Sequence, residues 1–373
     1  MTQNTPLVSV IVRTHNRADL LRNALDCLLN QTWPNLEIFV VDHNSSDNTA
    51  EIAKAFGDIV TYYLHKGSFR DTFNVWRDKV KGDFISVLDD DDYIKPDCIA
   101  KLMQSFLTRS DIDVAFSRYC FYIQEKDRCI IEKETERVDI AELKKLILFG
   151  NVIPWNAVVF RRKCLDGIPK IEDPIVGGFD YYFWMNMVLA GFRFYQLDEV
   201  LGYIQRSRDS VQFQTERMVT GGLQCVEFFG RHLSFTEKLS LDFYPKYGFR
   251  LITWGILCLE NGRISYGRAL LWKGILVYSF GISKRETLIP AILILFSALV
   301  SQPEKARLRI EKLFGAYLFR TYHQMRGQHK NPFKKTFMAP IVSKVISSLY
   351  KKEKASIALW KDWAKKSRRE SLN

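Results

Sequence analysis

The residues best suited to chemistry in this chain are four consecutive carboxylates, Asp89 to Asp92, which directly follow the apolar run at residues 84–88. Ionised carboxylates about 4 Å apart repel each other by roughly 4 kcal/mol at an effective dielectric constant near 20. The cluster therefore needs a positive partner. An isolated acidic tetrapeptide is more often a solvated loop, but this one follows a stretch that is typical of a buried strand.

The position of this acidic quartet, Asp89 to Asp92, indicates a ligand site. In open α/β sheets, ligands bind beyond the carboxyl ends of the strands. Carboxylates at such an end can hold a divalent metal, which usually keeps waters and substrate phosphates as its other ligands. We therefore expect a nucleotide diphosphate. The chain has no Gly-x-Gly-x-x-Gly after its first strand and no P-loop, which disfavours nicotinamide dehydrogenases and P-loop phosphotransferases.

Alternating strand and helix patterns in the first hundred residues predict an α/β fold with a mostly parallel sheet and helices on both faces. We expect strands at residues 7–12, 36–41, 59–63 and 84–88, and helices at residues 17–30, 46–56, 71–80 and 96–107. Further strands are expected at residues 113–117, 119–124, 128–132 and 157–160. The polar segments 13–17 and 42–47 and the acidic quartet each follow a strand, so the three should converge at one sheet edge.

These segments resemble the family 2 glycosyltransferases of the GT-A fold, a Rossmann-like α/β fold. The resemblance rests on residues 8–17, on residues 40–49, on Asn74, and on residues 82–84 with 88–92. Its order and spacing extend over residues 7–205. The family resemblance implies an inverting transfer of a sugar from a nucleotide-sugar donor, with Mn²⁺ or Mg²⁺ as cofactor.

The resemblance also assigns donor-binding residues. It places Thr14, Asn16 and Arg17 against the nucleotide, and Asp42 against the base, typically uracil, so a UDP-sugar is the expected donor. His43 follows Asp42 where the family often has a second acid, and Trp76 lies two residues beyond Asn74 where the family often has glycine. These two differences leave the identity of the donor sugar open.

Within the quartet, Asp89 and Asp91 match the ends of the family's Asp-x-Asp motif. The resemblance implies that Asp89 lies near the ribose and Asp91 on the metal, and both are candidate metal ligands. Asp90 fills the variable place between them and is assigned to donor binding, whereas Asp92 receives no role.

Two later segments complete the expected site. Residues 177–184 resemble a family motif that precedes an aromatic helix, and Asp180 keeps the second acid of that motif, so Asp180 is the expected general base. Its alternative role is to cap the helix at residues 181–189. Arg206 lies in a stretch that resembles the segment closing over the diphosphate, and it either binds phosphate or faces solvent. Trp155 either stacks on an acceptor sugar or belongs to the core.

Composition predicts a reduced, cytoplasmic location. The seven cysteines are scattered without a Cys-x-x-Cys pair, no signal peptide is expected, and the longest apolar run has 13 residues, too short to span a bilayer. Residues 326–373 carry 13 Lys and Arg against three acids, which accounts for +10 of the formal charge of +12. This tail is either a basic amphipathic helix for the inner face of an anionic membrane or a solvated segment; nucleic acid binding is disfavoured.

We expect three regions: a catalytic domain at residues 1–210, a helical appendage at 211–325 and the basic tail at 326–373. The expected function is sugar transfer to a hydroxyl of a saccharide or lipid-linked acceptor in cell-surface polysaccharide or glycoconjugate synthesis. The alternatives are a sugar nucleotidyltransferase and a non-catalytic membrane-surface adaptor.

Overall fold

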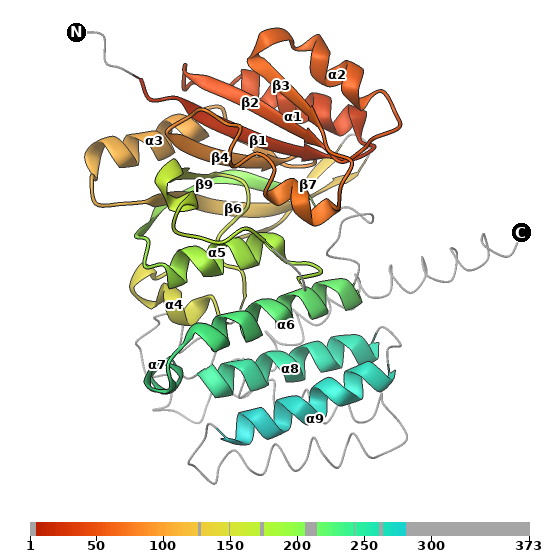
Figure 1. The fold of residues 1–373 in the computed structure, drawn as a ribbon, viewed down its shortest axis with the longest axis vertical. Helices are drawn as coiled ribbons and strands as arrows, with labels where there is room; N and C mark the ends of the chain where they lie inside the picture. The colour runs from red at the N-terminus through yellow and green to blue at the C-terminus, as the bar shows by residue number, and fades with distance from the viewer. Residues whose placement is uncertain are drawn as a thin grey trace, which may run out of the picture. The chain divides into compact units, whose positions relative to one another are not determined.

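The computed structural model describes residues 5–125, 128–148, 150–171, 175–205, 215–241, 243–260 and 264–280. In this part of the chain a nine-stranded sheet carries helices on both faces (Figure 1). The strands are β1 (Val8–Thr14), β2 (Leu36–Asp42), β3 (Val60–Leu64), β4 (Phe84–Asp89), β5 (Tyr93–Ile94), β6 (Val114–Glu125), β7 (Arg128–Glu134), β8 (Val158–Arg161) and β9 (Phe194–Gln205). The α-helices are α1 (Ala18–Leu29), α2 (Thr49–Ala55), α3 (Cys98–Thr108), α4 (Leu143–Leu146), α5 (Phe179–Leu189), α6 (Thr215–His232), α7 (Phe235–Ser240), α8 (Phe243–Glu260) and α9 (Ile264–Phe280). Short 3₁₀ helices are η1 (Gly57–Ile59), η2 (Phe69–Phe73), η3 (Ile140–Glu142) and η4 (Arg162–Leu165).

The strand order is β3-β2-β1-β4-β8-β6-β9-β5, with β7 paired to β6. The strands β1 to β4 are mutually parallel where they pair, and β8 lies antiparallel between β4 and β6. This arrangement confirms the expected α/β fold with flanking helices. The sheet, however, is mixed rather than mostly parallel, because antiparallel pairs join β4 to β8, β8 to β6, β6 to β7 and β5 to β9. Because the parallel strands all end on the same side, their following loops meet at one edge.

Strand β1 lies at the centre of the parallel half and is buried along its whole length. Alternate residues serve two separate cores: Ile11 packs in the cluster that contains α5, whereas Val10 and Val12 pack with α1 and α3. Burial on both faces explains why the strand is a nearly continuous apolar run rather than an alternating one.

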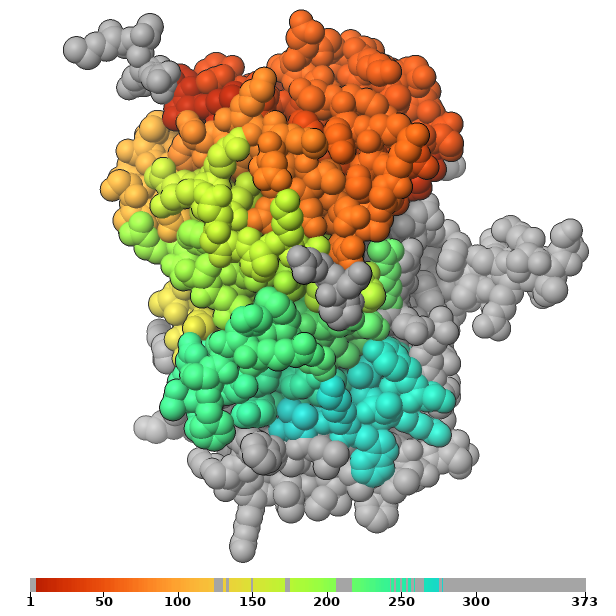
Figure 2. Space-filling view, in the orientation of Figure 1, coloured from red at the N-terminus to blue at the C-terminus, as the bar shows by residue number. Residues whose placement is uncertain are grey.

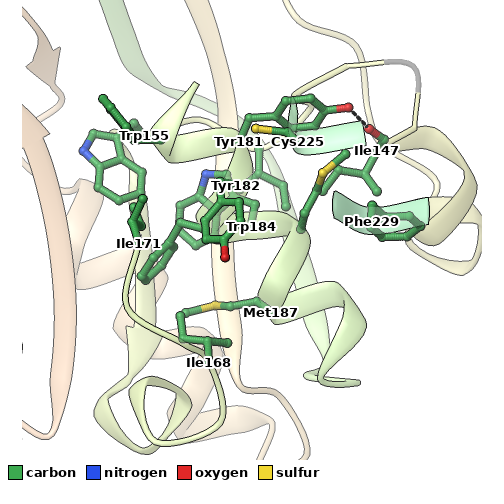
Figure 3. Packing of buried hydrophobic residues seen from close by; sticks show 14 of the residues in the cluster. Ile147, Trp155, Ile168, Ile171, Tyr181, Tyr182, Trp184, Met187, Cys225 and Phe229 are labelled. Atoms are coloured by element: carbon green, nitrogen blue, oxygen red, sulfur yellow. Dashed lines mark hydrogen bonds between the residues drawn. The ribbon is translucent and has the colours of Figure 1, made fainter. Parts of the chain in front are cut away.

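Helix α5 is apolar on all sides because the sheet covers one face and helix α6 covers another. Figure 3 shows Trp155 and Ile171 on one side of α5, and Cys225 and Phe229 of α6 on the other. The Tyr181 hydroxyl donates a hydrogen bond to the carbonyl oxygen of Ile147. Trp155 is 5% exposed and contacts the aromatic rings of α5, so the structure places it in the core rather than on an open sugar-binding surface.

Helix α6 also contacts the loop that leads into α5. A Cβ atom on Gly221 would lie 2.3 Å from the carbonyl oxygen of Gly177, so the two backbones touch. The Cys225 thiol donates to the carbonyl oxygen of Gly178 at 3.4 Å, and the Val176 N–H donates to Gln224 Oε1 at 3.0 Å. From outside, the green surface of α6 adjoins the yellow-green surface of the α5 region in Figure 2.

The predicted helix at residues 71–80 was wrong. The chain forms only the 3₁₀ helix η2, which starts at a capping box between Ser68 and Asp71. Beyond η2, Trp76 is fully buried and Arg77 donates hydrogen bonds to the carbonyl oxygens of Leu165, Ile168 and Pro169. These tertiary contacts override the local helical pattern.

In the region expected to be a helical appendage, residues 235–260 form two separate helices, α7 and α8, rather than one continuous helix. Ser234 and Glu237 form a capping box that starts α7, and α7 ends at Ser240. The rest of the expected appendage, residues 281–325, and the tail at 326–373 lie outside the described residues, so the three-region division stays a prediction. Among the helices that the structure describes, none has the length and apolarity needed to cross a membrane.

Replacing Gly221 by alanine should destabilise the protein by about 1–3 kcal/mol, since the new methyl group overlaps the Gly177 backbone, which cannot rotate away. The free energy of unfolding from urea denaturation measures the effect. Arg231→Ala, at an exposed position in the last turn of α6, is the matched control and should leave stability nearly unchanged. Equal stability of the Gly221→Ala variant and the wild type would show that the two backbones do not touch.

Candidate active site

The carboxyl ends of β1, β2 and β4 meet at one edge of the sheet. Thr14 lies opposite Asp42 in the β1–β2 register, and Arg13 lies opposite Asp89 in the β1–β4 register. The structure therefore brings together the three polar segments that the sequence places after strands. Both Thr14 and Asp42 are buried at this edge.

Asn16 links the loop after β1 to the loop after β2. Its N–H donates to Ser45 Oγ at 2.8 Å, and its Oδ1 accepts from the Ser46 N–H at 2.7 Å. Asn16 has a φ of 50°, in the left-handed region that Asn tolerates better than most residues. The exposed Asn16 thus holds two candidate donor-binding loops in a fixed relation.

Asp42 is held by three hydrogen bonds. Its Oδ1 accepts from the Ser45 N–H at 2.9 Å and from Ser45 Oγ at 2.6 Å, and its Oδ2 accepts from the Tyr62 hydroxyl at 2.6 Å. Burial, followed by the hydrogen bond to Asp42, raises the pKa of Tyr62, which therefore stays a donor. The position of the Asp42 carboxylate is fixed before any ligand arrives.

Arg13 neutralises the first acid of the quartet. Its Nη2 donates to Asp89 Oδ1, and its guanidinium carbon lies 3.7 Å from the centroid of the Phe73 ring and 5.4 Å from that of Trp155. Arg13 is 9% exposed, so this ion pair and cation–π contact are shielded from solvent.

Arg17 pairs with the next two acids. Its Nη1 lies 3.1 Å from Asp90 Oδ1 and 3.0 Å from Asp91 Oδ2. Burial, reinforced by the neighbouring Asp91 charge and opposed by Arg17, raises the pKa of Asp90 to about 7. Burial and then the Asp89 charge raise the pKa of Asp91, again against Arg17. The quartet is thus short of positive charge despite its two arginines.

Asp92 connects the quartet to β9. Its Oδ2 accepts from Asn156 Nδ2 at 3.0 Å, and its Oδ1 accepts from the Gln205 N–H at 3.1 Å. Burial raises the pKa of Asp92 well above its usual range. The acid that received no role from the sequence therefore fixes the end of the strand from which residues 206–214 continue.

Asp180 lies in the first turn of α5. The helix is capped by Gly178, whose φ of 64° suits glycine, and the structure therefore gives Asp180 a place inside the helix rather than at its N-cap. Asn151 Nδ2 donates to Asp180 Oδ2 at 2.7 Å. Burial raises the pKa of Asp180, and the Asp89 charge adds to this effect whereas Arg13 and Asn151 oppose it. Asp180 thus shares one electrostatic environment with the quartet.

A pocket of about 320 Å³ opens beside the acids. Its walls come from α1, the quartet, β5, β6 and β9, and its lining residues are Leu20, Asn23, Asp90, Asp91, Asp92, Tyr93, Tyr122, Tyr203 and Gln205. Thr14 Oγ1 and Asp90 Oδ2 are both buried at this edge. The Thr14 hydroxyl interacts with the Asp90 carboxylate and opposes the rise in its pKa.

The donor atoms of the quartet suit a hard divalent cation. Within the described ranges, no group of three or more His, Cys, Asp or Glu side chains is arranged to hold a metal. Mg²⁺, however, is usually bound by one or two carboxylates together with substrate phosphates. Asp91, with its partly exposed carboxylate and raised pKa, fits that arrangement.

Comparison with known proteins identifies the family. The family model described as Glycosyl transferase family 2 matches residues 9–163, which include β1, β2, β4 and the acidic quartet. These matched residues belong to glycosyl transferase family 2. An uncharacterized glycosyltransferase of Rickettsia typhi is 28% identical over 201 residues, which cover 50% of this chain and 61% of the relative. The chain thus spans about three fifths of that relative's length.

Two solved structures show the GT-A fold of this family. A mannosyltransferase from Pyrobaculum calidifontis, in complex with GDP-Man and Mn²⁺, has a TM-score of 0.53 and 18% identity, covering 87% of this chain and 85% of that one. Residues 1–349 of S. aureus TarS, in complex with UDP-GlcNAc, have a TM-score of 0.57 and 16% identity, covering 88% and 94%. The expected fold and family are therefore confirmed.

Sequence reasoning selected most of the side chains that meet at this sheet edge, but it missed three that contact them. Arg13 carried a signal, because a charged residue inside a buried strand requires a counter-charge. Asn151 and Asn156 carried none, since an amide in a loop has no distinctive pattern. Arg206 lies outside the described residues, so its predicted contact with phosphate stays a prediction.

The pKa of Asp90 predicts a pH-dependent stability. Folded Asp90 keeps its proton up to about pH 7, whereas its ordinary pKa is 3.8, so the folded state binds more protons between these values. The stability that protonated Asp90 contributes to the folded state is therefore fully present below about pH 4 and is lost as the pH rises through 7. The isosteric Asp90→Asn variant should raise the melting temperature relative to wild type, and by more at pH 8 than at pH 5.

Thermal denaturation at both pH values checks this expectation. Asp58→Asn, at an exposed acid, is the control and should behave alike at pH 5 and pH 8. A melting temperature of Asp90→Asn that falls at pH 8 would show that the ionised Asp90 carboxylate stabilises the fold.

Proposed function

We propose that this protein is an inverting, metal-dependent glycosyltransferase that moves a sugar from a nucleotide diphosphate, most simply a UDP-sugar, to a hydroxyl of a saccharide or lipid-linked acceptor in cell-surface polysaccharide or glycoconjugate synthesis. One observation carries the proposal. The carboxyl ends of β1, β2 and β4 bring Thr14, Asp42 and Asp89 together at one sheet edge, next to a pocket lined by the other acids of the quartet.

The donor site is formed by the loops after β1 and β2. Asn16 and Asp42 are held by hydrogen bonds there, and Thr14 lies buried opposite Asp42. The similar structures support a nucleotide-sugar donor, because one holds GDP-Man and the other UDP-GlcNAc. We propose UDP as the nucleotide because the family resemblance places Asp42 against the base, which is typically uracil. We include Arg206 as a phosphate contact of the proposed site.

Asp91, with Asp89, would hold Mn²⁺ or Mg²⁺. A metal bound there supplies positive charge against the charge that grows on the leaving diphosphate. Asp90 adds donor binding, and Arg13 keeps Asp89 in place, while Asp92 fixes the strand end beside the pocket.

Asp180 acts as the general base. It takes the proton from the acceptor hydroxyl as that oxygen attacks the anomeric carbon, and the bond from that carbon to the diphosphate oxygen breaks on the opposite side, which inverts the configuration. Burial holds the pKa of Asp180 closer to neutrality, which favours proton uptake during the reaction. Asn151, at 2.7 Å, orients the carboxylate through its amide.

The Asp91→Asn variant should lose metal-dependent binding of the donor nucleotide, because the amide cannot supply the charged oxygen ligand. Thermal shifts with UDP, GDP, ADP and CDP, each with and without Mn²⁺, measure the loss and identify the nucleotide. The wild type should be stabilised by one nucleotide only when Mn²⁺ is present. If no nucleotide shifts the wild type, or if Asp91→Asn responds as the wild type does, the proposed donor site is wrong.

The Asp180→Asn variant should bind the donor normally and lower kcat by about 10²–10⁴-fold, since the amide cannot accept the proton. Steady-state transfer of sugar to a panel of saccharide and lipid-linked acceptors measures the rate, and thermal shift confirms donor binding. Asp166→Asn, outside the site, serves as the control. Unchanged kcat in Asp180→Asn would exclude this residue as the base, and release of pyrophosphate from a nucleoside triphosphate would indicate a nucleotidyltransferase instead.

A further inference from the structure

The acidic quartet already holds positively charged partners, and they differ in how they are held. Arg13 is 8% exposed in its side chain, is stacked on Phe73 and pairs with Asp89. Arg17 is 31% exposed and lies at the N-cap of α1. Among the described residues, its side chain donates hydrogen bonds to Asp90 and Asp91. Arg13 is therefore fixed, whereas the Arg17 side chain can leave by rotating toward solvent.

The place that Arg17 occupies is the one that a divalent cation needs. Its Nη1 lies 3.0 Å from Asp91 Oδ2, and a metal on Asp91 would require an oxygen of the same carboxylate at about 2.1 Å. Two cations cannot share that position, because their charges repel at short range. A metal on either oxygen of Asp91 would lie close to the guanidinium, and the repulsion between the two cations favours release of Arg17 from Asp90 and Asp91.

We propose that Arg17 is a displaceable counter-ion that competes with the divalent cation for Asp91, so that the metal binds tightly only together with a nucleotide diphosphate. The diphosphate supplies the negative charge with which the released Arg17 guanidinium can pair. This inference rests on the proposed function, and it adds the order of binding: metal alone binds weakly, and metal with diphosphate binds cooperatively. By linkage, the diphosphate and the metal must strengthen each other's binding by the same factor.

The test measures Mn²⁺ binding to the full chain by the electron paramagnetic resonance signal of free Mn²⁺, without and with UDP or GDP. The variants are Arg17→Gln, which removes the charge, and Arg17→Lys, which keeps it. Arg22→Gln, at an exposed position on the same helix, is the matched control. Circular dichroism and the melting temperature confirm that each variant is folded.

Without nucleotide, Arg17→Gln should bind Mn²⁺ about tenfold more tightly than the wild type, since the competing cation is gone. Arg17→Lys should fall between them, and Arg22→Gln should match the wild type. The factor by which the nucleotide tightens Mn²⁺ binding should be smaller in Arg17→Gln than in the wild type. If Arg17 instead serves to hold the site in shape, Arg17→Gln should bind Mn²⁺ more weakly than the wild type.

Equal or weaker Mn²⁺ binding by Arg17→Gln overturns the proposal, as does the absence of Mn²⁺ binding in both the wild type and this variant. The readout does not depend on sugar transfer. A chain that transfers sugar but shows no effect of Arg17→Gln on Mn²⁺ affinity would keep the proposed function and lose this inference. A chain that transfers no sugar but binds Mn²⁺ more tightly as Arg17→Gln would keep the inference and lose the proposed function.

Discussion

The structure of this site depends on the repulsion among four adjacent carboxylates at the end of a buried strand. The protein meets this constraint in three ways: Arg13 and Arg17 supply charge, burial favours the protonated form of Asp92, and the pKa of Asp90 is raised to about 7. Each of these solutions involves a different neighbouring element. The loop after β1, the end of β9 and the segment containing Asn156 therefore all take positions around the quartet.

The same electrostatic environment reaches Asp180, which comes from a helix about ninety residues further along the chain. An ionised Asp180 beside Asp89 is costly, and Arg13 reduces this cost. Arg13 therefore serves both acids, although it forms an ion pair only with Asp89 among the contacts that the structure describes. The aromatic rings of Phe73 and Trp155 keep its guanidinium in a position where it can do so.

The sequence predicted the parallel strands because burial on both faces leaves continuous apolar runs. It predicted that the strand ends meet because a polar segment directly follows each of these runs. It also indicated Asp180 and the quartet, since both belong to motifs of fixed spacing. It did not predict the short η2 turn, because the contacts of Arg77 with the carbonyl oxygens of residues 165–169 come from a segment far away in the chain. The ion pairs of Arg17 were equally hidden, since a cation beside a candidate phosphate site is expected to face the ligand.

The glycine contact between α6 and the loop before α5 has a consequence for how such a protein can change over time. The backbone of Gly177 rests on Gly221, and Asp180 follows three residues later. A substitution in α6 that tilts the helix by a small angle moves the carboxylate without altering any residue that lines the pocket. On the proposed function, acceptor preference can therefore diverge between relatives whose donor-site residues are the same, through a helix that lies outside the matched family region.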